Sequence, residues 1–281
     1  YIFIKISCVI CIASTTSLLY SQNNKKLNHD ALPERIIDFF PDIALANVVG
    51  ERLNKRYTDK VTTQELSNIH GRFDAGPDGI SNLKGIGYLT GIDSFSCCKN
   101  GVTALPAEIG KMKNLVWIDL AKAFELKIIP PEIGNLKKLK YLNIGLTQLE
   151  TIPKEIGNLK SLDTLYLGSN NIKTIPKEIG NLKNLELLDI SSNQIEKLPD
   201  EICNLMSLRK LFITHNKLKS LPDDIGNLTN LQTLNLNNND LRYLPKSIIR
   251  LNNLTYLNVY DNDKLSEGYK KYLPEKLRNK K

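Results

Sequence analysis

The chain has 281 residues, of which 41% are apolar, and its charged residues are spread along the sequence rather than gathered in blocks. This length and composition are enough for a sizeable core, and they exclude a chain that is disordered beyond its ends. The formal net charge of +8 is compatible with contact with acidic surfaces and is equally common on soluble exported proteins, so it selects no class of function.

Residues 1–21 have the layout of a secretory signal peptide. Lys5 is the single basic residue, an apolar run follows, and the small residue Ser21 stands at the expected cleavage point. The apolar run is shorter than the roughly 20 residues that a membrane-spanning helix needs. We therefore expect a secreted or cell-surface protein whose mature chain has no integral membrane segment and begins with a flexible linker over residues 22–33.

The cysteines and histidines do not form a recognisable chemical site. Cys8 and Cys11 fall within the predicted signal peptide, and Cys97, Cys98 and Cys203 are an odd set without zinc-type spacing. The three histidines lack a nucleophile or a carboxylate partner at a catalytic spacing. We expect no metal, no cofactor and no enzymatic activity.

Residues 34–72 are predicted to form a small helical cap at the amino-terminal end. Their apolar residues recur at helical intervals, so that one face of each helix can be buried. These positions are Ile36, Ile37, Phe39, Phe40, Leu45, Val48, Val49 and Leu53. Such a cap would cover the end of the array of repeats that follows.

Residues 73–262 are predicted to form a repeat domain. The pattern L-x-x-L-x-L recurs every 23 residues, with one step of 24 between Leu115 and Leu139. We call each repeat a row, and the rows begin at Ile92, Leu115, Leu139, Leu162, Leu185, Leu208, Leu231 and Leu254. Alternating Leu residues predict a short strand in each row, and stacked rows would pair these strands into a parallel sheet. The Pro residues in the second half of each row exclude a central strand there and predict short helical or irregular turns on the convex side.

An Asn column follows the predicted strands. Its amides can donate and accept hydrogen bonds to the backbone of adjacent rows, which satisfies buried polar groups. The members are Asn100, Asn170, Asn193, Asn216, Asn239 and Asn262. Ala123 and Thr147 replace this Asn in two rows, and the extra residue of the long row falls near Phe124–Ile129, where we expect a local bulge.

Residues 263–281 are predicted to form a carboxy-terminal cap and tail. Apolar residues at helix-like intervals predict a short helix that closes the last row. They are Leu265, Tyr269, Tyr272, Leu273 and Leu277. The predicted fold is therefore an α/β solenoid, a horseshoe with a parallel concave sheet, a small helical amino-terminal cap and a short helical carboxy-terminal cap.

The residues between the inward Leu positions would line the concave face, where they can vary without damage to the core. Several are aromatic, and aromatic anchors with polar neighbours are typical of protein-binding surfaces. The candidate ligand-binding residues are Trp117, Tyr141, Tyr166, Leu187, Lys210, Phe212 and Tyr256. The alternative is that these are strand-favouring residues that pack against their cross-strand neighbours.

The repeats resemble leucine-rich repeats, and the segment that begins Phe40-Pro41-Asp42 and ends before Ile92 resembles the amino-terminal cap and first rows of the internalin family of bacterial surface proteins. That resemblance implies a helical cap on a solenoid that binds a protein. The family repeat is usually shorter than this one and lacks the Pro-x-Glu-Ile-Gly-Asn-Leu portion. The domains that often follow the repeats in the family are not seen here, so host-cell invasion is not implied.

Three functions are compatible with these features of the sequence. The first is an exported binding module, a monomer that recognises a protein or a glycoconjugate, with adhesion as one role and without affinity for nucleic acid. The second is an intracellular scaffold that regulates a signalling protein, and it would be favoured if residues 1–21 stayed attached. The third is a repeat protein with a fused catalytic domain, for which the residues after Asn262 leave no room.

Overall fold

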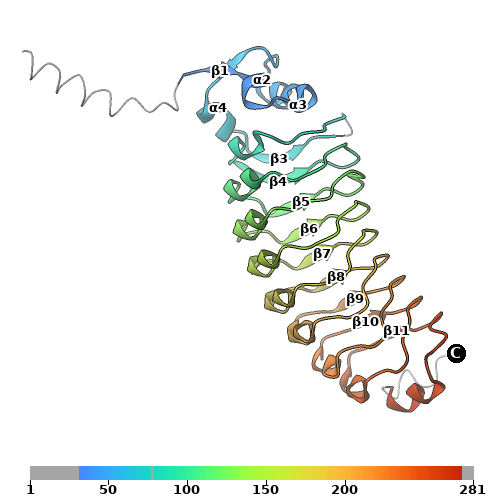
Figure 1. The fold of residues 1–281 in the computed structure, drawn as a ribbon. Coiled ribbons are helices and arrows are strands. Elements are labelled where there is room, and N and C mark those ends of the chain that lie inside the picture. The colour runs from blue at the N-terminus through green and yellow to red at the C-terminus, as the bar shows by residue number, and fades with distance from the viewer. Residues whose placement is uncertain (1–31, 77–78, 274–281) are drawn as a thin grey trace, which may run out of the picture.

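The computed structural model describes residues 32–76 and 79–273. The predicted signal peptide, most of the predicted linker and Leu277 lie outside these residues. The described chain forms one elongated, curved stack of rows with a helical cap at its amino-terminal end (Figure 1). No described helix is both long enough and apolar enough to cross a membrane.

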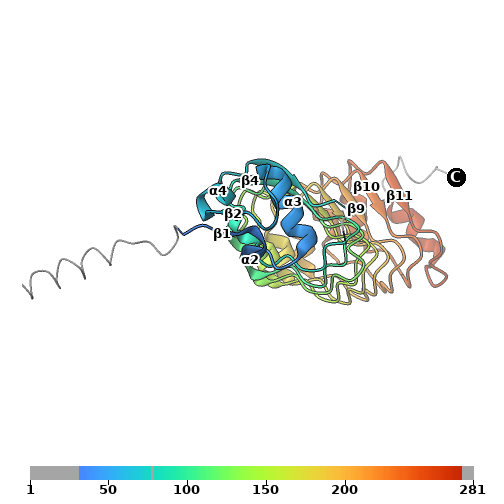
Figure 2. The ribbon, with the colours of Figure 1, turned by 90° about the horizontal axis from the view of Figure 1, so that it is seen from above.

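The amino-terminal cap consists of two short strands and three short helices. Strand β1 (Glu34–Arg35) pairs antiparallel with β2 (Lys60–Val61), and α2 (Ile36–Phe39), α3 (Ile43–Leu53) and α4 (Thr63–Ser67) pack beside them. Asp42 caps α3 by accepting a hydrogen bond from the backbone N–H of Leu45 at 3.1 Å. Of the predicted apolar positions, Ile36, Phe39, Phe40, Leu45 and Val49 are buried. Seen from above, the cap covers the end of the solenoid (Figure 2).

The cap is tied to the first row through Asp42. Its second carboxylate oxygen accepts hydrogen bonds from the backbone N–H groups of Ser81 and Asn82 and from the Ser81 hydroxyl, at 2.9–3.0 Å. Burial raises the pKa of Asp42, but these donors and the Leu45 N–H together lower it below its ordinary value. One side chain therefore begins a helix and also joins the cap to the repeats.

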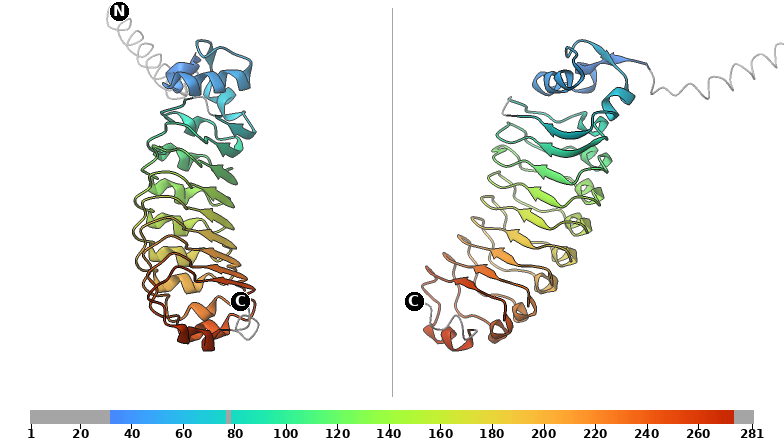
Figure 3. Two further views of the ribbon diagram at one scale, coloured as in Figure 1. Left: turned by 90° about the vertical axis from the view of Figure 1, so that its right-hand side faces the viewer. Right: turned by 180° about the vertical axis from the view of Figure 1, so that it is seen from behind.

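The repeats form a nine-stranded parallel sheet in chain order, as predicted. Figure 3 shows the strands stacked one above another along the solenoid. The strands are β3 (Gly71–Asp74), β4 (Ile92–Ser96), β5 (Trp117–Asp119), β6 (Tyr141–Asn143), β7 (Thr164–Tyr166), β8 (Leu187–Asp189), β9 (Lys210–Phe212), β10 (Thr233–Asn235) and β11 (Tyr256–Asn258). The sheet begins at Gly71, two residues before the expected start of the repeat domain.

The return segments on the convex side are short 3-10 helices, in agreement with the expectation of short helical turns there. They are η2 (Ile86–Tyr88), η3 (Ala107–Lys111), η4 (Pro131–Asn135), η5 (Lys154–Asn158), η6 (Lys177–Asn181), η7 (Asp200–Asn204), η8 (Ile225–Asn227) and η9 (Lys246–Arg250). A Pro precedes or begins most of them, because its fixed φ suits the start of a helix and it needs no N–H partner there. After β11, η10 (Glu267–Tyr272) closes the last row, and the buried Leu273 and half-buried Leu265 and Tyr269 pack against the core.

Glycine at one position lets neighbouring 3-10 helices approach closely. A Cβ on Gly134 would lie 2.5 Å from the backbone oxygen of Glu155 in the next row. Cys203 takes this position in η7. The helix of the following row, η8, has three residues instead of the usual five. The larger side chain at the glycine position thus coincides with a shortened helix in the adjoining row.

The predicted Asn column forms a ladder that is interrupted only at Ala123 and Thr147. The Asn193 amide accepts a hydrogen bond from Ile172 N–H at 2.9 Å and donates to the carbonyls of Leu167 and Ile190 at 3.0 and 3.1 Å. The other Asn residues of the column repeat this arrangement, and all are 9% exposed or less. No buried side-chain nitrogen or oxygen of the described residues lacks a hydrogen-bond partner.

The extra residue of the long row is absorbed outside the sheet. Strands β5 and β6 keep unbroken register, from Trp117 beside Tyr141 to Asp119 beside Asn143. The chain bulges after the strand, where Phe124 is 55% exposed. The expected bulge therefore lies in the loop, which has room to lengthen because its backbone is not held by the strand ladder.

Candidate binding surface on the parallel sheet

Sheet register places the outward residues of the rows in two columns. The first column runs from Ser94 through Trp117, Tyr141, Thr164, Leu187, Lys210 and Thr233 to Tyr256. The second runs from Ser96 through Asp119, Asn143, Tyr166, Asp189, Phe212 and Asn235 to Asn258. All seven predicted ligand-binding residues belong to these columns.

Three of the predicted residues form one surface, which we call the aromatic strip: Trp117, Tyr141 and Tyr166. The ring centroids of Trp117 and Tyr141 lie 5.3 Å apart with the planes 13° from parallel, and those of Tyr141 and Tyr166 lie 5.9 Å apart at 56°. Each side chain is half-buried. Aromatic pairs at such separations contribute roughly 0.5–1.5 kcal/mol beyond their buried area, so the strip is ordered before any ligand arrives.

The other four predicted residues lie on the strands that follow, β8, β9 and β11, outside the ring contacts of the strip. Leu187 is half-buried between Thr164 and the exposed Lys210. Phe212 is half-buried between Asp189 and Asn235. Tyr256 is 48% exposed on β11, at the far edge of the sheet. The structure therefore gathers Trp117, Tyr141 and Tyr166 and leaves the remaining candidates spread over later rows.

Arg72 extends the strip and was missed from the sequence. Its guanidinium carbon lies 5.3 Å from the centre of the Trp117 ring, and its Nη2 is 3.1 Å from the carboxylate of Asp74. The predicted cap ends at residue 72, whereas in the structure Arg72 belongs to β3. The signal was the alternation of Arg72-Phe73-Asp74, because the buried Phe73 stacks on Phe95 of the next strand at 6.3 Å.

The polar residues of the second column have a structural task. The carboxylates of Asp119 and Asp189 each accept a hydrogen bond at 2.9 Å from the N–H two residues later, and Asn143 does the same at 3.0 Å. These turns fix the chain as it leaves the strand. Tyr166 and Phe212 occupy the same column, and their rings do not accept a hydrogen bond from the N–H two residues later. At these two positions an aromatic ring therefore stands where most other rows place a side chain that accepts this hydrogen bond.

The aromatic strip lies beside carboxylates. Burial, followed by the neighbouring charge of Asp119, raises the pKa of the Tyr141 hydroxyl above its ordinary value. Among the described residues, Asp119, Asp163 and Asp189 form no ion pair with a basic side chain. Glu186, by contrast, lies 3.5 Å from Arg209.

The three cysteines of the described residues are free thiols whose pKa values are raised by burial. Cys97 and Cys98 are free, as is Cys203. Burial raises the pKa of the Cys97 thiol to about 12 and that of Cys203 to about 11, so both remain protonated at neutral pH. Burial also raises the pKa of Cys98. Within residues 32–76 and 79–273, no group of His, Cys, Asp and Glu side chains is arranged to hold a metal ion.

Two family models match this chain. The model described as "Leucine rich repeat" matches residues 113–172 and 160–218, and the one described as "Leucine-rich repeat region" matches residues 200–273. None of the curated proteins matches the sequence significantly.

Solved structures with the same architecture come from bacteria and plants. Internalin C2 of Listeria monocytogenes is 27% identical over 82% of this chain and 98% of that chain, with a TM-score of 0.69. A leucine-rich-repeat protein of Leptospira interrogans is 31% identical over 71% of this chain, with a TM-score of 0.61, and this chain spans only 56% of its length. A plant peptide hormone receptor, RGFR1 in complex with RGF2, is 32% identical over 68% of this chain and 30% of that chain, with a TM-score of 0.58.

The repeated strand, Asn ladder and convex turn, together with the family models, define the class: this chain is a leucine-rich-repeat protein. Its fold is internalin-like, because it superposes on internalin C2 over nearly the whole of that protein. The predicted fold class is thereby confirmed. The leucine-rich-repeat fold is generally a non-enzymatic scaffold that binds proteins.

Proposed function

We propose that this chain is an exported recognition module that holds a protein ligand on the concave face of its sheet. The observation that carries the proposal is the aromatic strip of Trp117, Tyr141 and Tyr166. Half-exposed aromatic residues on a rigid sheet supply a large contact area at little cost in conformational entropy.

A protein ligand is favoured by the class of scaffold. One similar protein is a plant peptide hormone receptor whose structure holds RGF2. The flanking polar residues of the second column can form the hydrated rim that surrounds the anchors in protein interfaces. A glycoconjugate ligand is the alternative chemistry, and the experiment below distinguishes it because only a protein adduct yields peptides of a second protein.

Export is proposed from the signal-peptide layout of residues 1–21, and the similarity to an internalin supports it. A secreted or surface-held monomer that mediates adhesion is consistent with a binding face and no assigned chemistry. The intracellular scaffold remains the competing hypothesis. It predicts that the protein stays in the cytosol with residues 1–21 attached.

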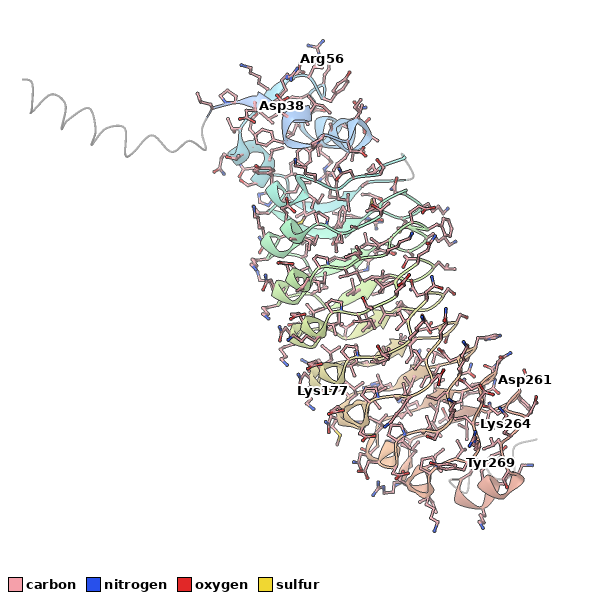
Figure 4. The ribbon with its side chains drawn as sticks, in the orientation of Figure 1. Asp38, Arg56, Lys177, Asp261, Lys264 and Tyr269 are labelled. Atoms are coloured by element: carbon pink, nitrogen blue, oxygen red, sulfur yellow. The ribbon has the colours of Figure 1, made fainter. Side chains whose placement is uncertain are left out.

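The test is site-specific photo-crosslinking in the cells that make the protein. A benzophenone residue replaces Tyr166 on the sheet or Lys177 on the convex side, where Figure 4 shows that side chain beside the 3-10 helices. We expect an adduct with one protein from position 166, lost when Trp117→Ala is added, and none from position 177. Adducts from position 177 alone would refute concave recognition, and a cytosolic, uncleaved chain would refute export.

A further inference from the structure

We propose that the concave face binds basic side chains of its ligand, Arg or Lys residues whose cations stack on the aromatic strip and pair with the carboxylate of Asp119 or, three strands further along, with that of Asp189. This inference rests on the proposed function and names the chemistry of the contact. It is carried by the contacts of Arg72, by the register of the two carboxylates, and by their lack of cationic partners.

The protein already seats a cation at one end of the strip. The guanidinium of Arg72 lies 5.3 Å from the centre of the Trp117 ring while it pairs with Asp74 at 3.1 Å. Arg72 has 61% of its side chain exposed, so burial does not force this position. The attraction of a cation to the face of an aromatic ring, assisted by a nearby carboxylate, accounts for it.

The same pair of groups, a ring and a carboxylate, recurs further along the face without a cation. In the second column the order is Asp119, Asn143, Tyr166 and Asp189, so the two carboxylates lie on either side of Tyr166 along the column. Each uses one oxygen to accept the N–H two residues later, and neither forms an ion pair within the described chain.

Other ligand groups fit this surface less well. A carboxylate or phosphate would meet two like charges across the strip and be repelled. A purely apolar side chain would cover the half-buried Asp119 and Asp189 and remove water from them without supplying a partner, which is costly. A cation satisfies both the rings and the carboxylates.

The chain provides its own reporter for the test, because Trp117 is its single Trp. The probe is a Gly/Ser peptide of about ten residues with central Leu-Arg-Leu-Arg, compared with a twin in which Glu replaces each Arg. We expect the Arg peptide to change Trp117 fluorescence saturably and the Glu peptide to leave it unchanged. Added salt should weaken the response, because the pairs are partly exposed to solvent.

Substitution by Asn removes each charge and keeps the fold intact, since Asn143 makes the same turn with its amide. Asp119→Asn and Asp189→Asn are each expected to weaken binding of the Arg peptide up to about 5-fold. Asp223→Asn, an exposed carboxylate on the convex side before η8, is the matched control and should not change it.

Equal binding of the two peptides, no response of Trp117, or unchanged affinity in both Asn variants would overturn the inference. It can also fail separately from the proposed function. If crosslinking at position 166 captures a protein whose attached peptide has no Arg or Lys, the concave face is a binding site for another chemistry. If position 166 yields no adduct, concave recognition itself fails.

Discussion

The hydrogen bonds of the Asn ladder predict that the side chain of Asn170 contributes to the stability of the fold. Its amide accepts hydrogen bonds from Leu149 N–H at 2.9 Å and from the Thr147 hydroxyl, and it donates to the carbonyls of Ile144 and Leu167 at 2.8 and 3.1 Å. Asn170→Ala leaves the Leu149 N–H without a partner in a site that is 8% exposed, whereas the Leu167 carbonyl keeps its bond from Asn193 and the Ile144 carbonyl its bond from the Thr147 hydroxyl. A buried unsatisfied N–H costs about 1–3 kcal/mol, so Asn170→Ala should destabilise the protein by about that amount.

The matched control is its neighbour. Asn171 is exposed and its side chain makes no hydrogen bond with the described residues, so Asn171→Ala should change stability by less than about 0.5 kcal/mol. Urea unfolding followed by circular dichroism measures both, and hydrogen exchange of the Leu149 amide reports the local loss. A difference between the two variants below about 0.5 kcal/mol would show that the ladder is not a source of stability.

Three further changes follow from local geometry. Gly134→Ala should destabilise by about 1–3 kcal/mol in urea unfolding, because its Cβ would meet a backbone oxygen at 2.5 Å, whereas Gly101→Ala, with its nearest atom at 3.8 Å, should be nearly neutral; equal effects would contradict this. Leu146 has φ 58°, which costs a branched aliphatic residue about 1–2 kcal/mol, so Leu146→Asn should raise the thermal midpoint, and a lower midpoint would contradict the strain. The pKa of Asp42 is lowered in the fold, so its carboxylate stabilises the protein above the unfolded pKa of roughly 3.9 and that stability is lost as the pH falls through the folded value. Asp42→Asn should therefore be less stable than the parent at pH 6, with a gap that narrows near pH 3; a gap independent of pH would exclude the charge as its source.

Some of the candidate site could be predicted from one row at a time. The alternation of inward Leu and outward residues identified Trp117, Tyr141 and Tyr166 as surface positions of one face, because successive side chains of a strand point to opposite sides. It could not distinguish them from Leu187, Lys210 or Tyr256, which share the pattern. The distinction came from ring contacts between rows, which depend on register.

The sequence alone determined the solenoid. A pattern that returns every 23 residues, with inward Leu, one polar Asn and a Pro-led return, allows only stacked rows, since no single row can bury its own apolar side chains. Only the tertiary structure decided which residues of neighbouring rows contact one another. Stacking brings Arg72 over Trp117, sets Gly134 against Glu155, and reveals the Asx turns of Asp119 and Asp189. The two interactions between rows join residues more than twenty positions apart, so no local propensity encodes them and they exist only once the rows are stacked.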